Sequence, residues 1–169
     1  MEVKMQNILV ARDMSKDSAQ VIRYALELGV KFHAQVHVLH VMPTVDASVM
    51  NMVSLAMGAD KLAQFNKQNE MELAEQTRKQ LVEIIEKEKD LMEEEVAHPV
   101  KIQVHHGEPV PKILTIADKL DADLIVVGSH SKGRLEYAFL GSVAEKILRK
   151  SHRPVMIVPP TALKKKRKK

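Results

Sequence analysis

Residues 122–160 read ADLIVVGSHSKGRLEYAFLGSVAEKILRKSHRPVMIVPP, and this stretch decides the fold class. Its opening run, Asp123 to Gly128, is almost wholly apolar, which is typical of a strand covered on both faces. A helical pattern begins near Gly141, and a second apolar run, Pro154 to Pro159, closes the stretch. A strand, a helix and another strand in this order predict a parallel pair joined by a right-handed crossover.

The same alternation extends through the rest of the chain. Strand patterns are found at residues 7–11, 35–43 and 100–106, and helical patterns follow the first and the third of them. The chain therefore predicts an α/β fold, an open five-stranded parallel sheet with helices on both faces. The least polar strands, Asn7–Ala11 and Asp123–Gly128, belong at the centre and the alternating strand Val100–His106 at an edge, which gives the order 3-2-1-4-5.

In this order the chain direction reverses between the first and fourth strands, and a crevice opens beyond their carboxyl ends. The first strand ends at Asp13, whose carboxylate is suited to accept a hydrogen bond from an amino group or a ribose hydroxyl, or else to cap the following helix. The fourth ends at Gly128, where the missing Cβ lets a ligand approach the backbone. Gly141 and Ser142 begin a helix whose free amides attract phosphate.

The amino-acid composition excludes several kinds of functional site. Cysteine is absent, which excludes disulfides, thiolate metal sites and cysteine nucleophiles. Aromatic residues make up 3%, too few for a stacking platform for single-stranded nucleic acid. No apolar stretch approaches the length of a membrane span and no secretory leader pattern is evident, so we expect a cytoplasmic protein.

The positive charge of the chain is concentrated in its last residues. Without Lys164–Lys169 the formal net charge of +4 becomes −2. We expect residues 161–169 to form a basic disordered tail, with a tether to nucleic acid or another anionic surface as the alternative. Residues 1–160 are expected to form one domain.

The middle of the chain is less regular. Residues 44–60 are rich in Met and predict no clear element; they either cover the crevice or add to an interface. A long helical pattern runs from about Asp60 to Glu95, as one helix or as two joined by a kink. Its expected apolar stripe consists of Leu62, Phe65, Leu73, Leu81, Ile84, Ile85 and Leu91.

Other chemical sites are poorly supported. His105 and His106 are adjacent on a strand and point to opposite faces, and His37 and His40 also diverge, so we assign no metal site. The chain contains neither a GxxxxGK[ST] phosphate loop nor a GxSxG nucleophile elbow. We assign no catalytic residue.

Between NILVARDMSKDS and PVMIVPP the chain resembles the universal stress protein family. The most specific likeness is the family's glycine motif, Gly-x2-Gly-x9-Gly-Ser/Thr, which here begins at Gly128 and ends at Gly141-Ser142. Ser131 occupies the position of the second glycine. The segments HVLHVMP, GEP and VAEKILRKSHRPVMIVP are also typical of the family.

This resemblance implies a Rossmann-like sheet of the adenine nucleotide alpha hydrolase-like kind, with ATP, ADP or AMP, with or without Mg²⁺, lying across the crevice. It also implies a homodimer paired through the C-terminal strand. The candidate nucleotide-binding residues, from motif and fold together, are Ala11, Arg12, Asp13, Val41, Val127, Gly128, His130, Ser131, Gly141, Ser142, Val143 and Ala144.

Two main functions remain open at this point, and weak ATP hydrolysis is a minor hypothesis. One is an adenine-nucleotide-binding regulatory protein of the stress response that acts as a homodimer. The other is a dimeric adaptor of the same fold that binds no nucleotide and works through protein contacts. The serine at position 131 favours the adaptor, because members of the family that lose these glycines tend not to bind ATP.

Overall fold

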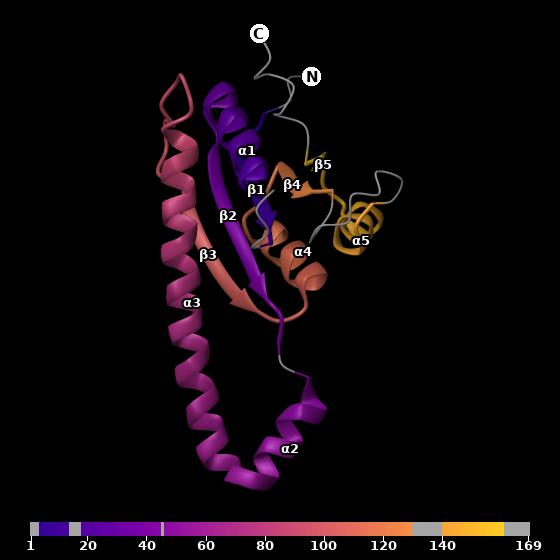
Figure 1. Cartoon of the computed structure of the whole chain (residues 1–169). Coiled ribbons are helices and arrows are strands. Elements are labelled where there is room, and N and C mark those ends of the chain that lie inside the picture. Colours follow the sequence, from indigo (N-terminus) through magenta and orange to yellow (C-terminus); the bar gives the residue numbers. More distant parts are fainter. Residues whose placement is uncertain (1–3, 14–17, 45, 130–139, 161–169) are drawn as a thin grey trace.

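The computed structural model describes residues 4–13, 18–44, 46–129 and 140–160. Strands and helices alternate, and one pair of consecutive helices interrupts the alternation (Figure 1). In chain order the elements are β1 Asn7–Arg12, α1 Ser18–Phe32, β2 Gln35–Met42, α2 Ala47–Met57, α3 Ala59–Lys89, β3 Lys101–His106, α4 Pro109–Lys119, β4 Leu124–Gly128, α5 Ser142–Lys150 and β5 Val155–Val158.

The five strands form one parallel sheet in the order β3-β2-β1-β4-β5, which confirms the predicted architecture. β1 and β4 are its inner pair at the reversal point, and β3 and β5 are its edges. The apolar runs of β1 and β4 pack on both faces: Ile8, Val10 and Val126 are fully buried on one side, and Leu9 and Ile125 on the other. Burial of each such side chain stabilises the fold by about 1.5–3 kcal/mol.

Helices cover both faces of the sheet (Figure 1). One core cluster joins β1, β2 and β4 to α1 and α3 through side chains such as Ile22, Leu26 and Leu81. The other joins the opposite face to α4 and α5 through Ile113 and Ile147. This division follows from the period of two along a strand, which sends neighbouring residues to opposite faces.

The segment between β2 and β3 differs from the sequence expectation. Residues 47–57, for which no element was predicted, form α2. Gly58 separates α2 from α3 with a φ of 84°, a left-handed conformation that strongly favours glycine. α3 is one continuous helix of 31 residues, about 46 Å long, and it ends at Lys89, short of Glu95.

The predicted apolar stripe of α3 is only partly buried. Leu62, Leu81 and Ile85 are buried, whereas Phe65 and Leu73 are 54% and 52% exposed. The reason is the length of α3: its first half runs past the carboxyl ends of the strands, where there is no sheet to cover it (Figure 1). Contact with the sheet begins near Thr77, whose hydroxyl lies 3.7 Å from the sulfur of Met42. Leu91, 54% exposed, follows the end of the helix.

Candidate functional site

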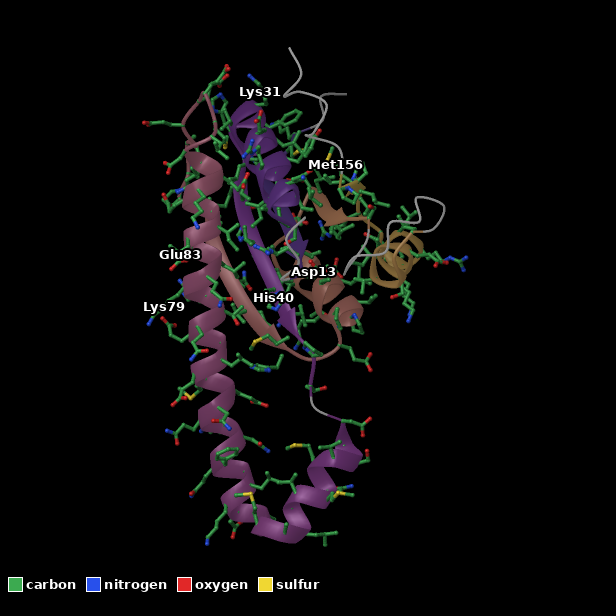
Figure 2. All side chains as sticks on the ribbon, in the orientation of Figure 1. Asp13, Lys31, His40, Lys79, Glu83 and Met156 are labelled. Carbon is green, nitrogen blue, oxygen red and sulfur yellow. The ribbon has the colours of Figure 1, made fainter. Side chains whose placement is uncertain are left out.

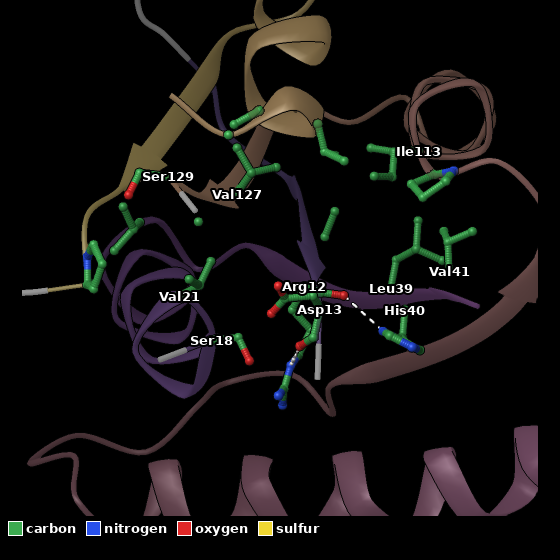
Figure 3. Close-up of a pocket in the computed structure, with 18 of the residues that line it drawn as sticks. Arg12, Asp13, Ser18, Val21, Leu39, His40, Val41, Ile113, Val127 and Ser129 are labelled. Carbon is green, nitrogen blue, oxygen red and sulfur yellow. Dashed lines mark hydrogen bonds between the residues drawn. The ribbon is translucent and has the colours of Figure 1, made fainter. Parts of the chain in front are cut away.

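A cavity of about 400 Å³ opens at the carboxyl ends of the strands, where β1 and β4 meet (Figure 3). Its volume lies in the range of small-molecule sites. Elements from both layers of helices contribute to its walls, because the reversal of strand order leaves the space between them unfilled. The lining residues are Ala11, Arg12, Asp13, Ser18, Val21, Leu39, His40, Val41, Pro43, Pro109, Ile113, Val127, Gly128, Ser129, Gly141, Val143, Ala144, Val158 and Pro160.

The end of β1 supplies the charged part of the lining. Asp13 directly follows the strand, and the Nε of Arg12 donates a hydrogen bond of 2.7 Å to the Asp13 carbonyl oxygen. His40 of β2 holds the other side of this turn, because its Nδ1 lies 2.9 Å from the Arg12 carbonyl oxygen (Figure 3). These two contacts fix the backbone from which the Asp13 carboxylate projects.

Arg12 is an unusually buried cation, with 7% of its surface exposed. Burial lowers the pKa of its guanidinium, and the nearby carboxylates of Asp13 and Glu88 act in the opposite direction. By the alternation along β1, its side chain shares the face of Ile8 and Val10, which pack toward α1 and α3. Arg12 therefore contributes to the cavity from the layer of α1 and α3.

The opposite wall is formed where β4, β5 and α5 converge. The Ser129 amide donates to the Val158 carbonyl oxygen at 3.0 Å, and the Gly141 amide donates to the Ser129 carbonyl oxygen at 2.7 Å. Gly141 is the N-cap of α5, with φ −62° and ψ 147°. The first amides of a helix lack intrahelical partners and carry a partial positive charge. The start of α5 thus brings an anion-attracting group to the cavity.

Between these two ends the walls are mainly apolar. Leu39 and Val41 come from β2, Ile113 from α4, Val127 from β4 and Val21 from α1 (Figure 3). Leu39 and Val41 share the face of β2 that packs against α4, so they lie beside Ile113 in the same core cluster. A cavity with an apolar middle, a carboxylate and a helix N-terminus suits a ligand that combines a flat ring with an anionic group.

The structure brings most of the predicted site residues together. Nine of them line the cavity: Ala11, Arg12, Asp13, Val41, Val127, Gly128, Gly141, Val143 and Ala144. Ser142 is not among the lining residues, and its side chain is exposed at the first position of α5. His130 and Ser131 lie outside the described residues.

Sequence reasoning did not find several other lining residues. Pro43 immediately follows β2 and Pro160 is the second residue after β5, so the general rule for carboxyl ends of parallel strands would have included them. Ser18 and Ile113 come from helices whose placement depends on tertiary packing, and no local pattern identifies them.

The histidines of β2 and β3 do not converge. His37 lies 3.3 Å from Asn7 Oδ1 and His105 lies 3.1 Å from Gln103 Oε1, on separate strands. Within residues 4–13, 18–44, 46–129 and 140–160, no group of three or more His, Cys, Asp or Glu side chains is arranged to hold a metal ion.

Comparison with known proteins places this geometry in a family. The sequence profile described as the universal stress protein family matches residues 4–159. The chain belongs to the universal stress protein family. A relative within this family, universal stress protein MJ0577 of Methanocaldococcus jannaschii, is 28% identical over 162 residues, covering 94% of this chain and 97% of that one.

Solved structures of the family share the fold. A structure of MJ0577 superimposes with a TM-score of 0.71 at 25% identity, covering 93% of this chain and 97% of that one. A universal stress protein in complex with cAMP has a TM-score of 0.59 at 19% identity, covering 93% and 98% of the two chains. One from Archaeoglobus fulgidus in complex with dAMP has a TM-score of 0.50 at 22% identity, covering 92% and 98%.

In the part of the chain that the structure describes, no helix combines the length and the apolar character that crossing a membrane requires.

Proposed function

We propose that this universal stress protein binds an adenine nucleotide in the cavity at the β1–β4 reversal point and acts as a regulatory protein of the stress response. One observation carries the proposal: Asp13, the apolar walls of β2 and α4, and the start of α5 all line one cavity. The family membership supports the same class of function.

The arrangement suggests how the nucleotide lies. Phosphate oxygens accept hydrogen bonds from the first amides of α5, at Val143 and Ala144. The base packs on Val41 and Ile113, and the Asp13 carboxylate accepts a hydrogen bond from a ribose hydroxyl or from the adenine amino group. The backbone contacts of Arg12 and His40 keep this carboxylate in place before the ligand arrives.

The solved structures of relatives narrow the choice among adenine nucleotides. Two solved relatives are complexes, one with cAMP and one with dAMP. Each of these ligands contains one adenine nucleoside and one phosphate, so we expect this unit to occupy the cavity whichever adenine nucleotide binds. ATP and ADP would add phosphates beyond the start of α5, and a Mg²⁺ ion would enter with them, bound by their phosphate oxygens.

The test begins with small molecules released from the purified protein and identified by mass spectrometry. Isothermal titration with AMP, ADP, ATP with Mg²⁺ and cAMP follows, with GMP as the control for the base. We expect binding of the adenine compounds and at least tenfold weaker binding of GMP, a difference of about 1.4 kcal/mol. An absence of both heat and thermal shift with every adenine compound would exclude the proposal.

A second candidate is an adaptor that binds no nucleotide and works through protein contacts. Two observations favour it: Ser131 replaces the second glycine of the motif, and the α2–α3 segment exposes many apolar side chains. The titration above separates the two candidates, because an adaptor gives no nucleotide signal.

We also propose that two copies pair through β5 and that the protein acts in the cytoplasm. β5 forms one edge of the sheet and pairs with β4 on its other side. Val155, Met156 and Ile157 are partly buried, and an apolar edge strand is a template for pairing with another chain.

A further inference from the structure

The helix pair between β2 and β3 forms an arm that projects past the carboxyl ends of the strands (Figure 1). We define the arm as α2, Gly58 and the first half of α3, residues 47–76. Pro43, at the rim of the cavity, is followed by the N-cap of α2 at Asp46. Thr77 and Arg78 attach the base of the arm to β2 and β3, through the Met42 sulfur and the Ile102 carbonyl oxygen.

Exposed apolar side chains are concentrated on this arm, whose side chains are drawn as sticks in Figure 2. In the described part of the chain, eleven large apolar side chains are exposed, and seven belong to the arm. Leu55 is 91% exposed and Met52 is 75% exposed. The seven residues are Val49, Met52, Leu55, Met57, Phe65, Met71 and Leu73.

Packing of α2 against α3 covers only some of the apolar side chains of α2. Met50 and Val53, three residues apart, are partly buried toward α3, where Asn66 Nδ2 lies 3.7 Å from the Met50 sulfur. Val49 and Met52, also three residues apart, point away and are exposed. α2 thus carries apolar side chains beyond the side that packs against α3, and a helix of eleven residues is only marginally stable by itself in water.

The charges around this apolar surface are mostly negative. α2 contains no charged residue, and Asp46 and Asp60 flank its two ends. Hydrogen bonds from the Ser48 hydroxyl and amide lower the pKa of Asp46, which keeps this carboxylate ionised. Over residues 46–76 there are five acidic residues, Asp46, Asp60, Glu70, Glu72 and Glu75, and two basic residues, Lys61 and Lys67.

We propose that the arm is a docking surface for an amphipathic helix of a partner protein, whose apolar face covers the exposed Val, Met, Leu and Phe side chains and whose flanks carry Lys or Arg. Methionine suits this use, because its flexible side chain adapts to different apolar surfaces. The acidic flanks of the arm select a basic partner, and the apolar contact supplies the affinity.

The same charges argue against other occupants. A second copy that packed its own arm against this one would bring the same excess of acidic residues, and an anionic lipid surface would be repelled. The chain's own end, residues 161–169, has the opposite charge but only one large apolar residue, Leu163, to cover seven side chains. The proposal goes beyond nucleotide binding and does not depend on it.

The test uses three synthetic fluorescent peptides of 14 residues and the full-length protein. The first is an amphipathic helix of Leu and Lys, the second has Glu in place of Lys, and the third has the Leu and Lys residues in scrambled order. Fluorescence anisotropy measures the dissociation constants. We expect the first peptide to bind at least tenfold more tightly than the other two, a difference of about 1.4 kcal/mol.

Paired variants assign the binding to the arm. The double variant Met52→Ser, Leu55→Ser removes exposed apolar surface from the arm. The triple variant Glu70→Gln, Glu72→Gln, Glu75→Gln removes negative charge. Each of these two variants should weaken binding of the basic peptide about tenfold. The control for the apolar variant is Leu148→Ser on α5, where the leucine is 52% exposed. The control for the charge variant is the triple variant Glu83→Gln, Glu93→Gln, Glu95→Gln, at three exposed positions outside the arm. Circular dichroism and the melting temperature verify the fold of each variant.

Four results would overturn the proposal. Equal binding of the basic and acidic peptides, or equal loss in the arm variants and their controls, would remove the basis for a basic partner helix. If sedimentation shows oligomers of the unaltered protein that are absent in the double variant Met52→Ser, Leu55→Ser, the surface binds a second copy of the chain. Co-sedimentation with phosphatidylcholine–phosphatidylglycerol vesicles, lost in the same variant, would assign it to a membrane.

Discussion

The backbone amide of Gly141 donates a hydrogen bond of 2.7 Å to the carbonyl oxygen of Ser129, across a chain segment of eleven intervening residues. This contact joins the N-cap of α5 to the residue after β4. It therefore sets where the free amides of α5 stand relative to the end of the sheet. The candidate phosphate position depends on this one backbone contact together with the strand order.

Gly141→Pro tests that contact. Its φ of −62° suits proline, but proline has no amide hydrogen to donate to Ser129. We expect the free energy of unfolding to fall by about 0.5–1.5 kcal/mol, which lowers the melting temperature by roughly 1–6 °C. Gly141→Ala keeps the amide and is the control; an equal loss in both variants would show that the hydrogen bond is not the cause.

Asp13→Ala tests the role of the carboxylate. Its loss should weaken binding of AMP by about 10- to 100-fold, because a hydrogen bond to a charged group contributes about 1.5–3 kcal/mol. Glu83→Ala, an exposed acidic position on α3, is the control for charge. Isothermal titration measures both. Unchanged affinity in Asp13→Ala would place the ribose and the base elsewhere.

Ser131→Gly restores the glycine of the family motif. If this position requires a positive φ, serine costs about 1 kcal/mol there, and the reversion should tighten nucleotide binding up to about tenfold. Ser131→Ala keeps the Cβ but removes the hydroxyl, so it should not reproduce the gain. Tighter binding in both variants would instead mean that the hydroxyl opposes the ligand.

Ile157→Pro tests pairing through β5. The carbonyl oxygens of Pro154 and Val158 accept hydrogen bonds from β4, so the backbone of Ile157, at an alternate position, points to the open edge. We expect light scattering to show a dimer for the unaltered protein and at least a tenfold rise in the dimer dissociation constant for Ile157→Pro. Ile157→Ala keeps the amide and should stay dimeric; a proline variant with full dimer stability would exclude this edge.

His37 predicts a pH dependence of stability. Burial, and secondarily Lys101, lower the pKa of His37, whose Nε2 faces Asn7 Oδ1 while its Nδ1 is buried without a hydrogen-bond partner. The folded state therefore disfavours the protonated form. Stability is fully present above the unfolded pKa of about 6.5 and falls as the pH drops below it toward the folded value, because the unfolded chain binds the proton more readily.

Urea unfolding at pH 7.5 and pH 5.5 measures this effect. The free energy of unfolding should fall at pH 5.5, and the fall should be smaller in His37→Gln than in the unaltered protein. His98→Gln, at an exposed position, is the control. An identical pH dependence in all three proteins would assign the effect to other groups. His105 is the next candidate, because burial lowers its pKa as well.

The pattern of apolar and polar residues was enough to predict the sheet and the location of the candidate site. Continuous apolar runs at β1 and β4 and the polar alternation of β3 were enough to order the strands, because burial on two faces requires a different pattern from burial on one. Once the order was known, Asp13, Gly128 and Gly141 were predicted to lie together at the reversal point, and they line one cavity.

Which side chains are covered depends on packing between elements, and the residue pattern does not contain this information. Phe65 and Leu73 belong to the same predicted apolar stripe of α3 as Leu81 and Ile85, yet the first pair is exposed and the second buried. Likewise, Ser142 lies between two lining residues and does not line the cavity itself. Periodicity reports which residues share a face of an element, whereas burial depends on how far the neighbouring elements extend, and the end of the sheet near Met42 sets that limit here.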